Sequence, residues 1–336
     1  MNILVNEKEN VTPSYDFPLC YRNDTATSWV PTSMEFFFGV FGNFIALILL
    51  WINRHDHRWD SFYKLFTGLV ITDFIGVIVV YPIATIRYAS DFTWCYPKNL
   101  CKFVSFIFVD AHLSGALLIC AMAVDRFMYS MSNTISNRTY TFILIGIWII
   151  ASLVSLLHLI GVGQSNLYFP GSWCYFDFIN DTTGNRIMSY LYSIFGFIIV
   201  LVTILMYVIT MIRICRDPER SGYFLDANRV SGYYDSHVMV FMTAVTVLFV
   251  ILWTPFLVDV FLHATNIRTQ RDNDKLELWL VRNAVNNAIL DPWLYIVLRK
   301  ESLRKIVLFY RKCRRASNPQ ELNQPGVDET DVLLTK

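Results

Sequence analysis

Residues 280–300 read Leu-Val-Arg-Asn-Ala-Val-Asn-Asn-Ala-Ile-Leu-Asp-Pro-Trp-Leu-Tyr-Ile-Val-Leu-Arg-Lys. The stretch is mainly apolar and is long enough to cross a hydrocarbon layer, which takes about 20 residues of helix. It nevertheless carries one arginine, Arg282, and one aspartate, Asp291, well inside the run. An ionisable side chain inside a bilayer costs at least about 2.5 kcal/mol, so both residues are candidates for a functional site.

The composition of the whole chain is that of a membrane protein. Hydrophobic residues make up 54% of the 336 positions and charged residues only 16%, whereas about 25% of an ordinary soluble protein is charged. The formal net charge is +1, so the basic excess that a nucleic-acid-binding protein needs is missing. We therefore expect membrane lipid as a partner and no nucleic acid.

Long apolar runs predict seven membrane-spanning helices. The expected fold class is an all-α membrane protein, a seven-transmembrane helix bundle followed by an amphipathic cytoplasmic helix. We divide the chain into an N-terminal segment (1–32), the bundle (33–298), an amphipathic helix on the membrane surface (299–315) and a disordered tail (316–336). The predicted spans cover about 33–53, 65–87, 101–130, 141–163, 188–212, 238–264 and 277–298.

The basic residues between the spans indicate an orientation. Loops on the side of the carboxyl terminus carry about twice as many Lys and Arg as loops on the other side, where Arg87 is counted, and such an excess marks the cytoplasm. We therefore expect a multi-pass plasma-membrane protein with an extracellular amino terminus and a cytoplasmic carboxyl terminus. Residues 1–33 lack the apolar core of a cleavable signal. Extracellular sequons, which are candidates for glycosylation, lie at Asn10, Asn23 and Asn180.

The cysteines divide by compartment. Cys20, Cys95, Cys101 and Cys174 fall on the extracellular side, where disulfides form. Spacing alone does not fix the connectivity of four cysteines. We expect Cys101, at the start of the third span, to bond to Cys174, which would hold the loop after the fourth span over the mouth of the bundle. Cys20 and Cys95 are either a second disulfide or two free thiols. On the cytoplasmic side, Cys313 is a candidate for palmitoylation.

Polar residues and prolines inside the spans distinguish a receptor from a transporter or a channel. Six motifs, each on its own predicted helix, together resemble the rhodopsin-like (class A) G-protein-coupled receptors over about residues 30–313. The resemblance implies a seven-helix receptor domain with a heterotrimeric G protein as its partner. The motifs are Gly42-Asn43, Asp73, Asp125-Arg126-Phe127, Trp148, Trp253-Thr-Pro255 and Asp291-Pro292-Trp-Leu-Tyr295.

The motif of the third span lies where that helix meets the cytosol. Asp125 can hold Arg126 until a conformational change frees it, and the resemblance implies that Arg126 then engages the G protein. The alternative is an ordinary charged pair at a helix end. Pro255 and Pro292 interrupt backbone hydrogen bonds and are candidate hinges. By the same resemblance, the residues of activation also include Trp253, Asp291 and Tyr295.

Asp73 and Asp291 are expected to form a polar cluster halfway down the bundle with Asn43 and Asn287. Asn287 shares a helical face with Asp291 because the two are four residues apart. Two neighbouring carboxylates do not both stay charged cheaply, so they share a proton, recruit a cation or bridge through water. A resemblance to sodium-sensitive receptors implies that the cluster rearranges on activation, with a sodium ion near Asp73 and no other cofactor. The alternative is a static network that fixes helix packing.

The outer half of the chain resembles a narrower family. The run from Gly161 to Cys174, which ends in Pro-Gly-Ser-Trp-Cys, is similar to the outer loop of prostanoid receptors, and segments at 68–76, 113–123 and 287–296 are similar to the same family. Prostanoids are C20 fatty acids, so a site for them needs a long apolar channel with one cation near its polar end.

Arg282 supplies that cation on the outer part of the seventh span. A guanidinium can hold a carboxylate with two parallel hydrogen bonds. The resemblance implies that the hydroxyls of Tyr88 and Ser172 donate to the same carboxylate and that Trp173, next to Ser172, belongs to the ligand site. The alternative is a salt bridge from Arg282 to one of two carboxylates, Asp259 or Asp110.

The start of the first span and the end of the seventh most resemble the relaxant prostaglandin E receptors, which raise cAMP through the stimulatory G protein. Trp253 instead favours the contractile receptors, which are coupled to calcium. A receptor for another lipid acid or for a peptide stays open. So does an organic-anion transporter, which should show internal repeats that we do not find. The sequence has no metal-ligand spacing, phosphate loop or nucleophile motif, so we do not expect an enzyme.

Overall fold

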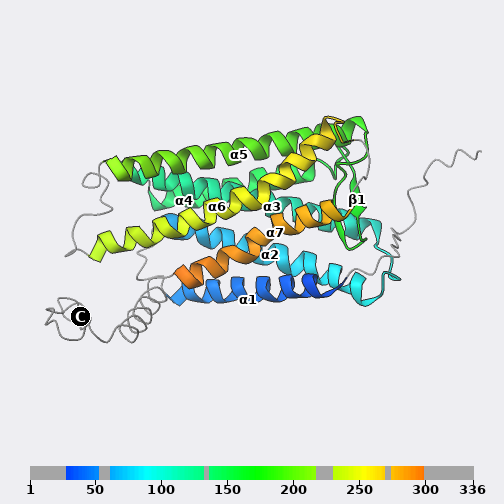
Figure 1. The fold of residues 1–336 in the computed structure, drawn as a ribbon, viewed down its shortest axis with the longest axis horizontal. Coiled ribbons are helices and arrows are strands. Elements are labelled where there is room, and N and C mark those ends of the chain that lie inside the picture. The colour runs from blue at the N-terminus through cyan, green and yellow to red at the C-terminus, as the bar shows by residue number, and fades with distance from the viewer. Residues whose placement is uncertain (1–27, 53–60, 132–135, 217–229, 269–273, 299–336) are drawn as a thin grey trace, which may run out of the picture.

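The computed structural model describes residues 28–52, 61–131, 136–216, 230–268 and 274–298. These residues form seven helices that run side by side along the long axis of the molecule (Figure 1). The predicted seven-helix bundle is thus confirmed. The helices are α1 (Val30–Ile52), α2 (Ser61–Ala89), α3 (Lys98–Ser130), α4 (Asn137–Leu156), α5 (Thr183–Arg216), α6 (Val230–Ala264) and α7 (Asp274–Leu298).

Six of these helices, α1 to α6, are long and apolar enough to cross a membrane. Their outer faces expose large apolar side chains such as Phe44, Ile150 and Ile251, a surface that a bilayer would cover. The seventh helix is 25 residues long but more polar, since it carries Arg282 and Asp291. It packs against α1, α2 and α6, and this packing removes its polar groups from the lipid side of the bundle.

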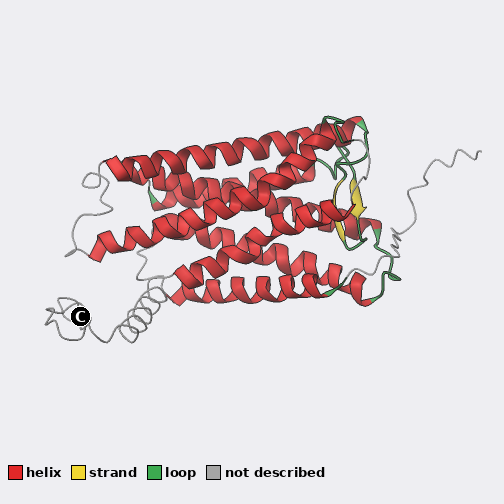
Figure 2. Cartoon of the chain, viewed as in Figure 1, coloured by secondary structure: helices red, strands yellow, loops and turns green. Residues whose placement is uncertain are grey.

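One end of the bundle is covered by a short antiparallel hairpin, β1 (Ser165–Tyr168) and β2 (Trp173–Phe176), drawn in yellow in Figure 2. We call this the hairpin end, and the opposite end, where Arg126 lies, the Arg126 end. A disulfide joins Cys174 of β2 to Cys101 in the first turn of α3, so this prediction is confirmed. Cys95 is disulfide-bonded as well, but its predicted partner, Cys20, lies outside the described residues.

The structure differs from the sequence prediction at several elements. The hairpin was not predicted, and the fourth span, expected over 141–163, ends at Leu156. The chain turns after that residue, and Gly161 adopts a φ of 105°, a conformation that only glycine takes without strain. At the Arg126 end, α5 and α6 extend beyond the predicted spans, to Arg216 and from Val230.

Some predictions fall outside the described residues and stay predictions. They concern most of the N-terminal segment at 1–32, the amphipathic helix at 299–315 and the tail at 316–336. The modification sites among them are Asn10, Asn23 and Cys313.

Candidate ligand site and polar core

Three helices meet around Arg282 at the hairpin end. The Nη2 atom of Arg282, on α7, donates one hydrogen bond of 3.0 Å to the Thr32 hydroxyl of α1 and one of 3.3 Å to the Tyr88 hydroxyl of α2. Thr32 and Tyr88 are both buried. The sequence pointed to Tyr88 but missed Thr32, which lies just before the predicted start of the first span. The guanidinium is therefore held by hydroxyl oxygens from two other helices.

The two carboxylates considered as alternative partners of Arg282 interact with other residues. Asp259 forms an ion pair with Arg268, and Asp110 accepts a hydrogen bond of 2.9 Å from Ser152. The alternative reading, a salt bridge from Arg282 to Asp259 or Asp110, is therefore not found among the described residues.

A carboxylate that the sequence analysis overlooked does lie near Arg282. Glu35, on α1, lies beside Tyr81 of α2 and within electrostatic range of Arg282. Glu35 is three residues after Thr32, so the two side chains project from the same face of α1. The signal was available, because Glu35 interrupts an otherwise apolar run.

A pocket with about 550 Å³ of empty space, part of it open solvent, lies between the helices. Tyr81 lines it at one level and the polar core lines it at another. Most of the remaining wall is apolar, as a lipid chain requires. The apolar and aromatic lining residues include Val77, Val80, Phe108, Ile119, Phe249, Trp253 and Val285.

His112, on α3, is a polar exception in the cavity wall. Its ring packs against Phe108, Tyr175 and Phe256. Neither of its ring nitrogens has a hydrogen-bond partner among the described residues. A neutral imidazole offers one donor and one acceptor, so His112 can hydrogen-bond a ligand that fills the cavity.

The hairpin brings Ser172 and Trp173 to the same end of the bundle, and both are buried. Trp173 stacks on Tyr168 with ring centroids 4.5 Å apart, and its Nε1 donates to the Phe169 carbonyl. In the described part of the chain, the hydrogen bonds of Arg282 go to α1 and α2 and not to either hairpin residue. The predicted roles of Ser172 in carboxylate binding and of Trp173 in the ligand site stay predictions.

Arg87 is a second cation that the sequence analysis placed wrongly. It was counted among the outer-loop residues but lies in the last turn of α2 and is fully buried. Its Nε donates to the Gly171 carbonyl at 2.7 Å and its Nη1 to the Phe92 carbonyl at 3.3 Å. These bonds fasten the turn of the hairpin to α2, so the partners of Arg87 are backbone carbonyls, whereas those of Arg282 are side-chain hydroxyls.

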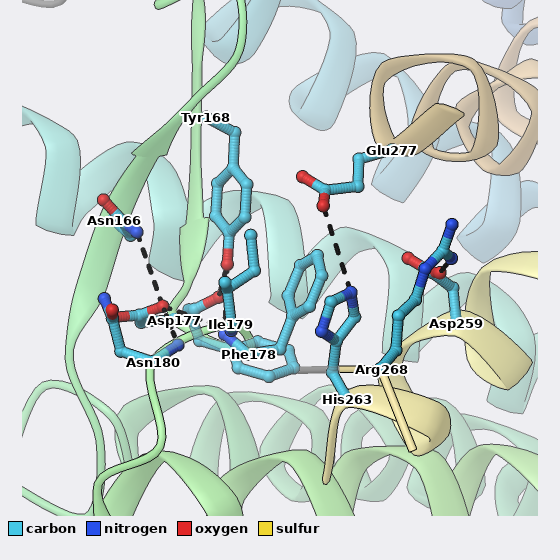
Figure 3. A network of polar contacts seen from close by, with 11 residues as sticks. Asn166, Tyr168, Asp177, Phe178, Ile179, Asn180, Asp259, His263, Arg268 and Glu277 are labelled. Atoms are coloured by element: carbon cyan, nitrogen blue, oxygen red, sulfur yellow. Dashed lines mark hydrogen bonds and ion pairs between the residues drawn. The ribbon is translucent and has the colours of Figure 1, made fainter. Parts of the chain in front are cut away.

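Figure 3 shows how the hairpin joins α6 and α7. The Tyr168 hydroxyl donates to the Phe176 carbonyl and accepts from the Phe178 amide, and the Phe178 ring lies 5.7 Å from the ring of His263 on α6. His263 in turn lies 3.9 Å from Glu277 of α7. Asn180, one of the predicted glycosylation sites, is exposed beside this network. These contacts thus link the hairpin to α6 and α7.

The predicted polar cluster is assembled at the middle of the bundle. Asp73, Asn287 and Asp291 all line the cavity, and the two carboxylates are close enough to repel each other. Asn43 donates from Nδ2 to the Ala288 carbonyl at 3.0 Å. Several buried oxygens of these residues have no hydrogen-bond partner in the described chain: Asn43 Oδ1, Asp73 Oδ2, Asn287 Oδ1 and both oxygens of Asp291.

At the Arg126 end, Asp125 and Arg126 form the predicted pair. The Nε and Nη2 atoms of Arg126 donate to one Asp125 oxygen at 2.8 and 2.5 Å, and only 2% and 3% of the two side chains are exposed. The guanidinium also lies over the rings of Phe62 and Tyr129, 5.1 Å from each centroid. The pair is buried and the Arg126 guanidinium is covered by two aromatic rings. It therefore differs from an ordinary charged pair at a helix end, whose charges reach water.

The remaining predicted activation residues lie on α6 and α7. Trp253 lines the cavity and stacks on Phe249, with ring centroids 5.3 Å apart. Tyr295 packs against Phe66, 5.0 Å between centroids. The two helices also contain the candidate hinges, Pro255 in α6 and Pro292 in α7.

Comparison with known proteins agrees with this geometry. The human (Homo sapiens) prostaglandin E2 receptor EP4 subtype is 27% identical over 323 residues, which cover 83% of this chain and 65% of the relative. The human thromboxane A2 receptor is 28% identical over 316 residues, 88% of this chain and 89% of the relative. The chain thus spans slightly less than two thirds of the EP4 subtype.

The solved structures and the family models agree on the fold. The crystal structure of squid rhodopsin superposes with a TM-score of 0.72 at 18% identity and covers 82% of this chain and 78% of rhodopsin. The family model described as 7 transmembrane receptor (rhodopsin family) matches residues 42–295. Its members are receptors and not enzymes. This chain therefore belongs to the rhodopsin family of seven-transmembrane receptors.

Proposed function

We propose that this protein is a receptor for a prostanoid, specifically of the prostaglandin E series, and that it raises cAMP through the stimulatory G protein. The hairpin end would face the outside of the cell and the Arg126 end the cytoplasm. The charge asymmetry of the loops supports this orientation. The similarity to the prostaglandin E2 receptor EP4 subtype supports the ligand class.

The observation that carries the proposal is the setting of Arg282. A membrane-embedded cation at the hairpin end, hydrogen-bonded within the described chain to two neutral hydroxyl oxygens, lies two residues before Ala284, which lines the mainly apolar cavity. An acid with a long hydrocarbon body matches both halves of this site. The carboxylate would take two parallel hydrogen bonds from Arg282, and the hydrocarbon body would fill the cavity as far as Trp253.

Signalling would pass from the ligand towards the Arg126 end of the bundle. A ligand that touches Trp253 touches α6 two residues before Pro255, where the missing backbone hydrogen bond lets the helix swing. Movement of α6 away from α3 would release Arg126 from Asp125, and the freed guanidinium would engage the G protein. The stimulatory class is proposed from the similarity to the EP4 subtype.

The polar core would bind a sodium ion in the resting receptor. Five unpartnered buried oxygens from four residues fit a hard cation, and the positive charge would offset the repulsion between Asp73 and Asp291. The chain's own residues would orient the oxygens, and Asn43 would tie them to α7 through the Ala288 carbonyl.

A second candidate is a contractile-type prostanoid receptor coupled to calcium. Two observations favour it: the similarity to the thromboxane A2 receptor over 88% of this chain, and the tryptophan at position 253.

The test is a panel of prostaglandins of the E, D, F and I series and a stable thromboxane mimetic, applied to cells that express the full chain. Both cAMP and calcium are recorded, with surface expression measured in parallel. We expect the E series to raise cAMP at the lowest concentration. Arg282→Ala should raise the EC50 by about 100-fold or more, because a buried charged hydrogen-bond partner is lost.

The matched control is Arg186→Ala. Arg186 lies on α5 at the same end, pairs with Asp181 and is 41% exposed, so its loss should leave the EC50 unchanged. A calcium response to the thromboxane mimetic would select the second candidate. Full potency in Arg282→Ala would remove the carboxylate anchor and with it the prostanoid proposal.

A further inference from the structure

His112, on α3, lines the cavity about one helical turn from the polar core. Three residues further along α3, a Cβ on Gly115 would lie 3.7 Å from an oxygen of the Asp73 carboxylate, and three residues of helix rise by about 4.5 Å. One turn before His112, Phe108 lines the same cavity. His112 therefore lies in the part of the cavity between the hairpin and the polar core, where the body of a ligand would be.

The imidazole of His112 is packed among aromatic rings. Its centroid lies 4.8 Å from the ring of Phe108, 6.1 Å from that of Tyr175 on β2 and 6.4 Å from that of Phe256 on α6. The one hydroxyl on these three rings belongs to Tyr175, and it donates to the Tyr192 hydroxyl at 2.8 Å. Both ring nitrogens of His112 are buried and have no hydrogen-bond partner among the residues that the structure describes.

This setting gives the cavity a preference among ligands. A buried donor or acceptor without a partner is costly, and a neutral imidazole has one of each. A hydrocarbon chain beside His112 would leave both nitrogens unpaired, whereas a hydroxyl or keto oxygen would pair with one of them. Water is a poor substitute here, because an ordered water needs about two to four polar partners and the neighbouring side chains are aromatic.

We propose that His112 hydrogen-bonds an oxygen on the body of the ligand and so selects an oxygenated lipid acid over a plain fatty acid. Arg282 would bind the carboxylate, which both kinds of lipid carry, and His112 would recognise the oxygen that distinguishes them. Prostaglandin E2 has three such oxygens: a keto group and a hydroxyl on its ring, and a hydroxyl on its side chain. The inference rests on the proposed function, because it assumes that the ligand enters this cavity.

The experiment is competition binding on membranes that contain the full chain. The four ligands are prostaglandin E2 and three analogues, each of which lacks one of those oxygens. His112→Phe keeps a flat ring but removes both nitrogens, and His112→Leu is a second apolar variant if phenylalanine impairs folding. We expect the Kd of prostaglandin E2 to rise by about tenfold or more in either variant. The Kd of one analogue should change by less than about threefold, because the oxygen that pairs with His112 is already absent.

Two further variants separate a hydrogen bond from a packing effect. His112→Gln keeps a donor and an acceptor, so it should bind prostaglandin E2 more tightly than His112→Phe does. The matched control is Phe108→Leu, which changes the cavity wall one turn away without removing a polar group. Any loss of affinity in this control should be the same for all four ligands.

The outcomes distinguish this inference from the proposed function. If prostaglandin E2 binds the wild-type chain but all four ligands lose affinity equally in His112→Phe and His112→Leu, the role of His112 is refuted and the proposed function stands. A site that recognises no oxygen through His112 cannot give unequal losses. If prostaglandin E2 does not bind the wild-type chain, the proposed function is refuted and this inference with it.

Discussion

The Tyr88 hydroxyl of α2 accepts a 3.3 Å hydrogen bond from the Arg282 guanidinium of α7. The two residues are 194 positions apart in the chain, and Tyr88 is only 6% exposed. A hydroxyl that accepts a bond from a cation keeps its own hydrogen available for donation. Tyr88 therefore places a donor next to the cation, which is the arrangement that a carboxylate needs.

Tyr88→Phe should weaken binding of the acid without unfolding the site. The ring and its packing against Phe92 are kept, and only the hydroxyl is lost. A hydrogen bond to a charged group contributes roughly 1.5–3 kcal/mol, so we expect an increase in Kd of at least about tenfold in competition binding on membranes. Tyr190→Phe makes the same chemical change on α5, where Tyr190 packs against Phe261, and should have no effect. An unchanged Kd in Tyr88→Phe would place the carboxylate elsewhere.

The helices and the anchor of the hairpin could be predicted because their signals are local. Each span is an apolar run of sufficient length, Cys101 begins the third span, and Cys174 lies in the loop after the fourth span on the same, oxidising side. Arg282 and Tyr88 were placed by resemblance, and their contact follows once α2 and α7 are neighbours in the bundle.

What the sequence did not predict depends on contacts between distant residues. All four residues of β2 are buried, so the alternation that marks a strand is missing. Arg87 was assigned to an outer loop because a cation at the end of an apolar run normally reaches water. Its partners are the carbonyls of Gly171 and Phe92, and the bond to the hairpin cannot be read from the sequence near Arg87. Glu35 could be seen in the first span, but its proximity to Arg282 could not.

Gly42→Ala should destabilise the contact between α1 and α7. A Cβ at this position would lie 2.6 Å from Nε1 of Trp293, and that nitrogen donates to the Phe38 carbonyl at 3.1 Å. The indole would have to move and lose this bond. We expect the free energy of unfolding to fall by about 1–3 kcal/mol, measured as a lower Tm of purified receptor.

The control for this prediction is Gly146→Ala on α4, where a Cβ would meet nothing within 4 Å. Alanine is the better helix former by about 0.5–1 kcal/mol, so the Tm should stay constant or rise. Equal Tm values for the two variants would show that α1 and α7 are not closely packed at Gly42.

His158 should make stability depend on pH in the acid range. The residue follows the end of α4, is 3% exposed, and its Nε2 lies 3.1 Å from the Ser105 hydroxyl. Burial lowers the pKa of His158 from 6.5 to about 4. Below pH 6.5 His158 binds a proton in the unfolded chain but stays neutral in the folded chain. The free energy of unfolding therefore has its full value above pH 6.5 and decreases as the pH falls towards 4.

The measurement is the Tm of purified receptor between pH 7.5 and 5, compared with His158→Gln. We expect the wild-type stability to fall by about 2 kcal/mol between pH 6.5 and 5 from this group alone. The glutamine variant keeps all other titrating groups, so the difference between the two proteins isolates His158. Parallel curves for the two proteins would mean that His158 is protonated in the folded state or accessible to water.

Asp125→Asn should raise signalling in the absence of ligand. Arg126 is held by two hydrogen bonds to one Asp125 oxygen, and both are charge-assisted, which makes them about twice as strong as neutral bonds. Asparagine keeps the shape but loses the charge, so the state in which Arg126 is released becomes more populated. We expect basal nucleotide exchange on the G protein to rise severalfold at equal surface expression, and Arg126→Ala to abolish exchange with or without ligand. If the asparagine variant kept the wild-type basal rate, the Asp125–Arg126 pair would be a structural contact and the resting state would be held elsewhere, with the polar core around Asp73 and Asp291 as the next place to test.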